Sequence, residues 1–340
     1  MPIAYISPYS NETNDYIELV KSIVRDCGHD VQPLSLRTLV SSRVWGLFDQ
    51  RNVILVHWLE TRAFSHDARG ARLKPSGLLQ FLIYFAVLMC ARARLIYFVH
   101  DHAVHDLTGW RRTLSVRLIQ SLCWLADARV VHDPSFQTRY RAQYLPHPLY
   151  KEALALAEAP RSPRKPPFKA GILGAIRPYK RIEHIIPTWP EDWQLLIRGR
   201  CEPGYEAELG KLISKRANGA HIDLDVGFMS REAFNDALEG LDALVLPHAD
   251  ASALVSGAFF EAIGNVPLVI ARKSPFTTWA QQQFQGVLTF ETAEELAERL
   301  VEARQLLQDP AFDGASIANK ARSLFAREAC VREYGAQLNR

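Results

Sequence analysis

The first half of the chain alternates short apolar runs with stretches of helical spacing. Between the first two runs, the apolar residues of Asp15–Cys27 recur every three or four positions, and Gly28 follows them. Short apolar runs separated by helices are typical of parallel strands that are covered on both faces. The pattern therefore predicts strands at Ile3–Ile6, Val31–Leu34, Val53–His57, Leu95–Val99 and Val130–His132.

The same alternation resumes after residues 155–168, a proline-rich stretch without apolar period that we expect to be a linker. The chain is thus predicted to hold two doubly wound, Rossmann-like α/β domains, 1–154 and 169–320. A last helical stretch, Ile317–Asn339, has no strand after it, and residues 321–340 form a separate C-terminal helix in this scheme. In the second domain we expect strands at 169–174, 194–197, 222–226, 243–246, 267–270 and 287–290, and helices at 180–187, 204–217, 231–239, 256–264 and 293–308.

The most apolar segment is Leu78–Cys90, which lies between basic residues on both sides: Arg72 and Lys74 before it, Arg92 and Arg94 after it. It is shorter than the ~20 apolar residues that a transmembrane helix needs. Two interpretations stay open. The segment is a buried helix between layers, or it is a helix whose outer face rests on a membrane with its arginines at the headgroups.

Composition limits the classes of function. The 340 residues are 48% hydrophobic and 23% charged, as in an ordinary globular protein. Residues 1–150 hold 17 Lys or Arg against 12 Asp or Glu, a net of +5, which is too little to indicate a nucleic-acid partner. The five cysteines form no CxxC pair, so we expect neither disulfides nor structural zinc. MPIAYISPYS has no basic n-region or long apolar h-region, so we predict a cytoplasmic protein.

The stretch Gly171–Ile186 carries the clearest chemical signal. An apolar strand ends at Gly174, and Arg177 and Lys180 follow just before a predicted helix. Two cations at such a turn suit a diphosphate, because the helix N-terminus adds free N–H groups and partial positive charge. The chain has no GxGxxG after its first strand, no GxxxxGK[ST] and no HExxH, so the nicotinamide, P-loop and zinc-protease motifs are absent.

Histidines gather at the predicted strand ends in the first half. His57, His100 and His132 each close a strand, and VHDHAVHD adds His102 and His105. Ligands of parallel sheets collect at the carboxyl ends of strands, which makes these positions candidates for function. His100 and His102 point in opposite directions in an extended run, and no third ligand at helical spacing is evident, so no metal site is expected.

Two Rossmann-type domains joined by a Pro-rich linker resemble the GT-B glycosyltransferases, whose domains face a central cleft. The resemblance also implies that the C-terminal helix, residues 321–340, packs back on the N-terminal domain. GAIRPYK, residues 174–180, is similar to the diphosphate-binding motif of family-four-type transferases, including the mannosyltransferases of xanthan-type gum assembly. Gly174 and Lys180 match that motif. Ala175 replaces its usual arginine, and Arg177 lies closer to the lysine.

A second stretch of this resemblance is Leu246–Ile270. It implies that the N–H groups of Ser256 and Gly257 reach phosphate or sugar oxygens, and that Glu261 binds the ribose hydroxyls. The second glutamate of many retaining members is Ala253 here, which is a departure from the pattern. The resemblance further places Arg198 near the phosphates and the 227–229 backbone, with Phe228, beside the base.

The candidates for catalysis lie in the first domain. The HD pair after the fourth strand resembles the transferase feature beneath the donor sugar. If the enzyme inverts the anomeric centre, His100, Asp101, His105 or Glu60 could take the proton of the acceptor hydroxyl, given a suitably tuned pKa. If it retains the configuration, the leaving phosphate takes the proton of the acceptor hydroxyl and no enzymic base is needed.

The resemblance thus implies a metal-independent hexosyltransferase without cofactor. Its donor would be a nucleotide-diphosphate sugar, foremost GDP-mannose, and its acceptor a polyprenyl-diphosphate-linked oligosaccharide of exopolysaccharide biosynthesis. The anionic inner face of the plasma membrane would be a peripheral partner. The alternatives are a GT-B transferase or nucleotide-sugar epimerase with a soluble substrate, or a non-catalytic binding module of the same fold. The sequence does not distinguish the sugar, the base or the anomeric outcome.

Overall fold

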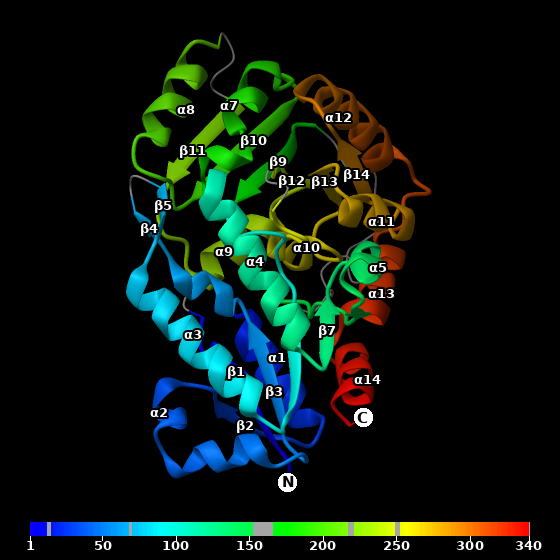
Figure 1. Cartoon of the computed structure of the whole chain (residues 1–340). Helices are drawn as coiled ribbons and strands as arrows, with labels where there is room; N and C mark the ends of the chain where they lie inside the picture. Colours follow the sequence, from blue (N-terminus) through cyan, green and yellow to red (C-terminus); the bar gives the residue numbers. More distant parts are fainter. Residues whose placement is uncertain (12–14, 68–69, 152–165, 217–220, 249–251, 340) are drawn as a thin grey trace. The chain divides into compact units, whose positions relative to one another are not determined.

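The computed structural model describes residues 1–339 except 12–14, 68–69, 152–165, 217–220 and 249–251 (Figure 1). The chain divides into two compact units. The first contains Met1–Tyr150, Ala251–Val255 and Phe325–Arg340, and the second contains Lys151–Asp250 and Ser256–Leu324. Most of the proline-rich stretch lies outside the described residues.

The first unit is built on a parallel six-stranded sheet of order β2-β1-β3-β6-β7-β8. The burial of β3 and β6 on both faces explains their continuous apolar sequences. The predicted strand Val130–His132 is shifted, because β7 ends before His132. The strands are β1 Ile3–Ser7, β2 Asp30–Pro33, β3 Val53–His57, β6 Arg94–Phe98, β7 Ala128–Val131 and β8 Gln143–Tyr144, and a separate hairpin is formed by β4 Phe64–Asp67 and β5 Gly70–Leu73.

Helices cover both faces of this sheet. α1 (Tyr16–Asp26) and α14 (Arg327–Leu338) share one apolar cluster with the sheet, and Arg327 forms an ion pair with Asp26 at 2.7 Å. α3 (Pro75–Cys90) and α4 (Gly109–Leu125) pack on the other face. The remaining helical elements are α2 Leu36–Leu39, α5 Gln137–Tyr140 and the 3-10 turns Ser42–Phe48, Leu59–Ala63 and Pro134–Phe136. Among the described residues, no helix is both long enough and apolar enough to cross a bilayer.

The second unit has a parallel sheet of order β11-β10-β9-β12-β13-β14. α7, α8 and α12 cover one of its apolar faces. Its strands are β9 Phe168–Leu173, β10 Trp193–Gly199, β11 Ile222–Val226, β12 Ala243–Leu246, β13 Leu268–Arg272 and β14 Val287–Phe290. Its helices are α7 Ile182–Ile185, α8 Tyr205–Ser214, α9 Arg231–Glu239, α10 Gly257–Ala262, α11 Pro275–Gln283, α12 Ala293–Gln308 and α13 Gly314–Phe325. The predicted final stretch is therefore two helices, α13 and α14, because Ala326 has an extended backbone.

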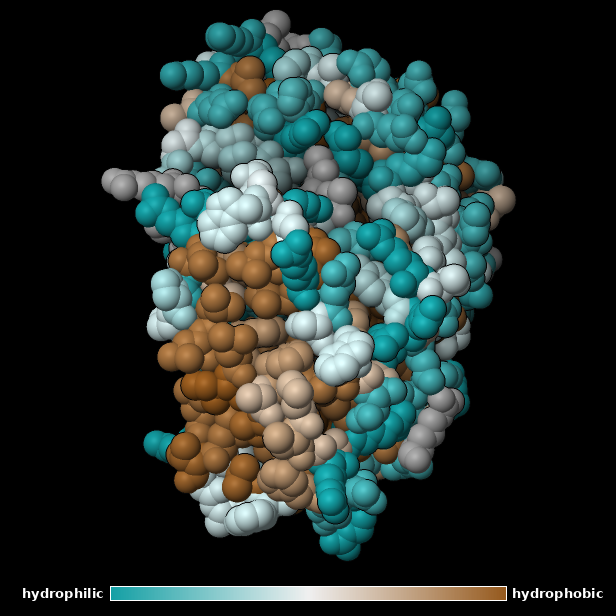
Figure 2. Space-filling model, viewed as in Figure 1, coloured by the Kyte–Doolittle hydropathy of each residue, from teal (hydrophilic) through white to brown (hydrophobic). Residues whose placement is uncertain are grey.

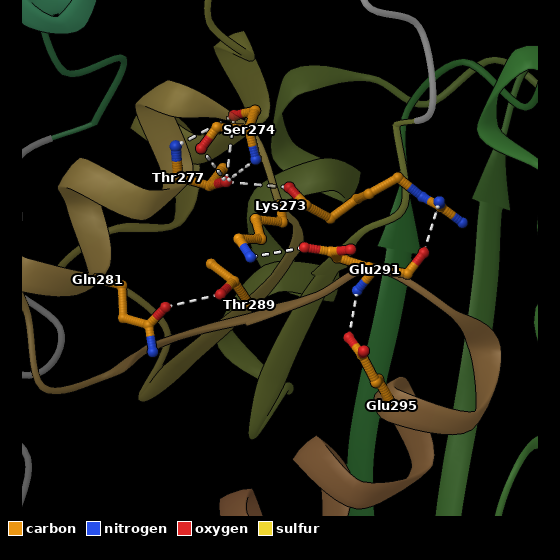
Figure 3. A network of polar contacts seen from close by, with 8 residues as sticks. Lys273, Ser274, Thr277, Gln281, Thr289, Glu291 and Glu295 are labelled. Carbon is orange, nitrogen blue, oxygen red and sulfur yellow. Dashed lines mark hydrogen bonds and ion pairs between the residues drawn. The ribbon is translucent and has the colours of Figure 1, made fainter.

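Polar groups at the ends of β13 and β14 form hydrogen bonds and an ion pair with one another (Figure 3). Lys273 forms an ion pair with Glu291 at 2.6 Å, and Glu295 accepts a hydrogen bond from the Glu291 backbone N–H. Ser274 and Thr277 form a capping box at the start of α11. This edge of the sheet therefore supplies its own counter-charges.

Two glycines allow the ends of β9 and β10 to approach closely. Gly174 has φ +89° and donates its N–H to the Arg198 carbonyl at 3.0 Å. Gly199 has φ +140°, and a Cβ atom there would lie 1.9 Å from the Gly174 carbonyl oxygen. Only glycine fits this contact between backbones.

Four buried histidines form the polar part of the core at the carboxyl end of the first sheet. His57 Nδ1 and His100 Nε2 are 2.9 Å apart, and the Tyr16 hydroxyl lies 2.7 Å from His132 Nε2. His147 packs against both Tyr16 and His132. Burial is the main cause that lowers the pKa of each, to about 4 for His132 and well below the ordinary value for His57, His100 and His147. At neutral pH the cluster is therefore uncharged.

We expect Gly199→Ala to destabilise the second unit by about 2 kcal/mol or more, because the new Cβ atom meets backbone and alanine rarely adopts this φ. Gly210→Ala in α8 is the matched control. Nothing lies within 4 Å of its Cβ position, and alanine should stabilise the helix by about 0.5–1 kcal/mol. Urea unfolding of both variants checks this, and equal stability of the two would contradict the steric assignment.

We expect acid to destabilise the first unit selectively. The unfolded histidines bind protons near pH 6.5 and the folded ones only at lower pH, so their contribution is complete above pH 6.5 and is lost as pH falls toward about 4. His132 should remove about 1.4 kcal/mol of stability per pH unit in that window, and the other three histidines act in the same direction. Glu60 and Asp133, whose folded pKa values are raised, oppose this loss but are fewer. Hydrogen exchange, corrected for intrinsic rates, should show protection in β3 and β6 falling between pH 7 and 5 much more than in β9 and β10. A parallel decline in both units would refute the prediction.

Candidate active site

Lys180 is the central residue of the candidate donor site in the second unit. Its side chain is buried at 4% exposure, and Nζ lies 3.5 Å from the Leu173 carbonyl oxygen at the end of β9. No carboxylate among the described residues forms an ion pair with it. Burial, and after it the charge on Arg177, lowers the pKa of Lys180 to about 8, so the ammonium form still prevails at neutral pH.

The backbone around Lys180 differs from the predicted helix 180–187. The 3-10 turn Pro178–Lys180 is followed by Arg181 at φ +49°, the four-residue helix α7 and a second turn at Ile186–Thr188. Pro187 explains the break, because it donates no backbone hydrogen bond and clashes with the preceding turn. The side chains of this loop, more than a helix dipole, therefore supply its positive charge.

The loop after β9 also meets the loop after β12. The rings of Tyr179 and His248 lie 5.8 Å apart, and Arg177 is exposed next to them along the chain. Neither ring was predicted as a site residue, because nothing in the sequence pairs positions so distant. The contact places both strand ends at one edge of the sheet, where ligands of parallel sheets bind.

Glu261 lies in α10 at 7% exposure, and its Oε1 accepts a hydrogen bond from Arg231 Nη1 at 2.7 Å. Arg231 is the first residue of α9 and was missed by the sequence analysis, since it resembles any charged residue at a helix start. Ser256 precedes α10 as its N-cap residue and Gly257 opens the helix. A carboxylate fixed on a guanidinium in this way is oriented to accept further hydrogen bonds, as a ribose would offer.

The side chain of Arg198, which was expected near the phosphates, does not point toward the carboxyl edge of the sheet. Its Nη2 contacts Asp223 at 3.0 Å and its Nε lies 3.9 Å from Asp225, both on β11. Asp223 is in register with Leu196, two residues earlier than Arg198, so the guanidinium leans back toward the amino end of the strand. Two nearby carboxylates account for its charge without any ligand.

Phe228 lies just beyond the end of β11 and is 87% exposed. The preceding Gly227 N–H donates to the Gly199 carbonyl at 3.0 Å, which links this loop to the glycine turn of β10. An exposed phenyl ring at the edge of a sheet offers a flat apolar surface that can stack on a nucleobase.

In the first unit, Glu60 is a buried carboxyl group with perturbed acidity. It is 1% exposed, and the Tyr97 hydroxyl donates to its Oε2 at 3.0 Å. Burial raises the pKa of Glu60 to about 7, and the negative charge of Asp101 acts in the same direction. A carboxyl group with this pKa exchanges protons readily near neutral pH.

Asp101 and His105 form a pair suited to proton transfer. His105 Nε2 lies 3.2 Å from Asp101 Oδ1, and the histidine is 41% exposed while the aspartate is 11% exposed. Ala253, where the predicted resemblance to retaining transferases would have a glutamate, forms an antiparallel bridge with Asp101. An exposed imidazole oriented by a more buried carboxylate is the arrangement of a general base.

The other polar residues of this region are placed differently. His100 belongs to the buried cluster, where its Nε2 contacts His57, so its side chain is part of the core. His102 contacts the Tyr140 hydroxyl through Nδ1 at 2.5 Å and stacks on that ring. Within the described part of the chain, no three His, Cys, Asp or Glu side chains are grouped as metal ligands.

The comparisons with known proteins identify the fold. No protein-family model and no curated protein matches the sequence. HepE of Anabaena, solved in complex with UDP, superposes with a TM-score of 0.68 at 12% identity over 100% of both chains. Sucrose-phosphate synthase of Thermosynechococcus elongatus gives 0.64 at 14% identity, over 100% of this chain and 98% of that chain. Trehalose-6-phosphate synthase OtsA gives 0.65 at 9% identity, over 100% and 99%.

These identities are low, so the likeness concerns the fold. None of the three structures is a gum mannosyltransferase, and that finer resemblance stays a prediction. The predicted fold class is confirmed: the chain has the α/β fold with parallel sheets that GT-B glycosyltransferases share.

Proposed function

We propose that this protein is a glycosyltransferase that moves a hexose from a nucleoside-diphosphate sugar to a polyprenyl-diphosphate-linked oligosaccharide. The observation that carries the proposal is the buried Lys180 ammonium, which has no carboxylate partner among the described residues, at the edge where Tyr179 and His248 meet. A buried cation is costly unless it is paired, and a diphosphate is the counter-ion that suits it. Glu261, held by Arg231, would bind the ribose.

In the reaction the acceptor hydroxyl attacks the anomeric carbon and the bond to the diphosphate breaks. Lys180 and Arg177 would stabilise the negative charge that grows on the leaving diphosphate. If the configuration inverts, His105, oriented by Asp101, would take the hydroxyl proton. If it is retained, the leaving phosphate would take the proton. We propose no role for a metal ion or another cofactor.

Two donors are candidates. GDP-mannose follows from the resemblance of GAIRPYK to gum mannosyltransferases. A UDP-sugar is supported by HepE, whose structures contain UDP and UDP-glucose. In either case Phe228 would stack on the base, a contact that tolerates both guanine and uracil.

A membrane-bound acceptor is supported by the outer surface of α3. Gly77, Phe81, Tyr84 and Leu88 face the core, whereas Leu79, Leu82, Ile83 and Met89 are 40–59% exposed. Figure 2 shows the apolar surface gathered over α3. No Asp or Glu occurs between Asp67 and Asp101, and Arg72, Lys74 and Arg92 are exposed beside the helix. An apolar face with basic residues at both ends suits an anionic bilayer surface.

We expect Lys180→Met to weaken binding of the cognate nucleoside diphosphate by about 10- to 150-fold, the loss of a hydrogen bond to a charged group. Wild-type affinity should also fall as pH rises above about 8, where Lys180 loses its proton, and the variant should lack this pH dependence. Thermal shift and calorimetry with GDP, UDP, ADP and TDP measure both. Lys273→Met, which removes a surface cation paired with Glu291, is the control.

A transfer assay in EDTA, with GDP-mannose and UDP-sugars as donors and lipid-linked acceptors, tests the activity itself. Turnover in wild type that falls at least tenfold in Lys180→Met supports the proposal. No turnover with any donor, together with equal nucleotide affinity in the two proteins, would leave a non-catalytic module as the better description.

We expect Leu82→Glu to abolish most cosedimentation with anionic liposomes, because it places a carboxylate in the apolar face of α3. Val301→Glu on α12, a position 46% exposed in the second unit, is the matched control and should bind as wild type does. If wild type does not sediment with the liposomes, a soluble acceptor is favoured.

A further inference from the structure

A cavity of about 470 Å³ in the first unit is lined by none of the residues proposed for catalysis or donor binding. It is bordered by α4 on one side and by α5 with the residues after it on the other. Its charged lining consists of four arginines: Arg112, Arg129, Arg139 and Arg141. None of the described residues that line it carries a carboxylate.

The contacts of these arginines leave their charges uncompensated. Arg112 Nη1 donates to the Ser252 hydroxyl at 2.7 Å, and Arg129 donates to the backbone carbonyls of Cys123 and Tyr140. Arg139 lies over the ring of Tyr140 at 5.8 Å. All of these partners are neutral. In the described part of the chain, no carboxylate forms an ion pair with any of the four guanidinium groups, in contrast to Arg198 and Arg231 of the second unit.

Neutral hydrogen-bonding groups complete the polar wall. The hydroxyl of Tyr140 contacts His102 Nδ1 at 2.5 Å. Burial first, and then the charge of Arg139, lowers the pKa of His102 to about 4, so this imidazole is uncharged at neutral pH. His102 directly follows Asp101 in the chain, so the cavity wall and the Asp101–His105 pair share one loop.

The remaining wall is apolar. Val116, Ile119 and Cys123 of α4 line the cavity, and Trp124, 72% exposed, lies at the end of that helix. α4 itself packs beside α3, whose outer face is apolar. Between Asp106 and Asp127 the sequence has no Asp or Glu. The cavity therefore offers concentrated positive charge next to apolar surface.

We infer that this cavity binds the diphosphate of a prenyl-diphosphate lipid. Planar guanidinium groups match the geometry of phosphate oxygens, and several of them together match two linked phosphates. The apolar wall and Trp124 suit the first prenyl units next to the diphosphate. This inference rests on the proposed function, in which such a lipid carries the acceptor sugar. It assigns the acceptor's diphosphate to α4 and α5, separate from the donor's diphosphate at Lys180.

The test measures binding of soluble probes by titration calorimetry. Farnesyl diphosphate, inorganic diphosphate and farnesol are titrated into the Lys180→Met protein, in which the donor phosphate site is weakened. We expect farnesyl diphosphate to bind at least tenfold more tightly than either other probe. Equal affinity of inorganic diphosphate would overturn the lipid assignment in favour of a free phosphate ligand, and equal affinity of farnesol would overturn the role of the arginines.

Single substitutions in the cavity provide the second arm. Arg139→Gln and Arg141→Gln change exposed side chains and should each weaken farnesyl diphosphate binding about tenfold. Arg117→Gln removes the same charge from an exposed position of α4 that does not line the cavity, and it should leave the affinity unchanged. Unchanged affinity in both cavity variants would overturn the inference.

Nucleotide binding separates this inference from the proposed function. If it is correct, Arg139→Gln and Arg141→Gln leave nucleoside-diphosphate affinity as in wild type. A protein that binds farnesyl diphosphate through these arginines but binds no nucleoside diphosphate supports the cavity assignment and contradicts the transferase. Nucleotide binding and turnover without any effect of the cavity variants contradicts only the cavity assignment.

Discussion

The buried ammonium of Lys180 is the constraint on which the candidate donor site depends. A positive charge at 4% exposure, with no carboxylate partner in the described part of the chain, loses much of its hydration, and the Leu173 carbonyl offsets only part of that loss. Two other cations of that unit show the contrast. Lys273 pairs with Glu291, and Arg231 pairs with Glu261. Carboxylates therefore neutralise these two cations, whereas none of the described carboxylates pairs with Lys180.

The backbone around this lysine explains how a ligand could approach it. Gly174 and Gly199 bring the ends of β9 and β10 together without side chains between them, and Gly227 is hydrogen-bonded to the same turn. The ends of β9, β10 and β11 are therefore formed by glycine backbone without side chains, and the exposed Phe228 lies just beyond the end of β11. A phosphate needs close access to N–H groups and cations, whereas a base needs a flat apolar surface. The N–H groups of Gly174 and Gly227 are already hydrogen-bonded to backbone carbonyls, so at this edge Lys180 would meet the phosphate and Phe228 the base.

Most strands were predictable because parallel strands buried on both faces leave continuous apolar runs. The break after Lys180 was less visible: the apolar spacing of Ile182, Ile185 and Ile186 suggested a helix, although Pro187 opposes it. Lys180 and Glu261 were predicted as site residues from motifs, which are local in sequence. Arg231 lies 30 residues from Glu261, and Tyr179 lies far from His248, so only the folded chain brings these partners together. The Asp101–His105 pair could be anticipated from the sequence because the two residues are only four positions apart.

The structure shows where the positive charge of the N-terminal half is concentrated. Its excess of five positive charges over 150 residues is too small to indicate a partner when averaged over the surface. Four of its arginines nevertheless line one cavity, while the buried histidines of the same unit are held neutral. Burial thus keeps the histidines of the core uncharged. Because α4 has no Asp or Glu, the positive charge of the cavity arginines is not neutralised from that helix. A small net positive charge is therefore concentrated at one cavity, and an anionic ligand interacts with this local charge rather than with the average over the surface.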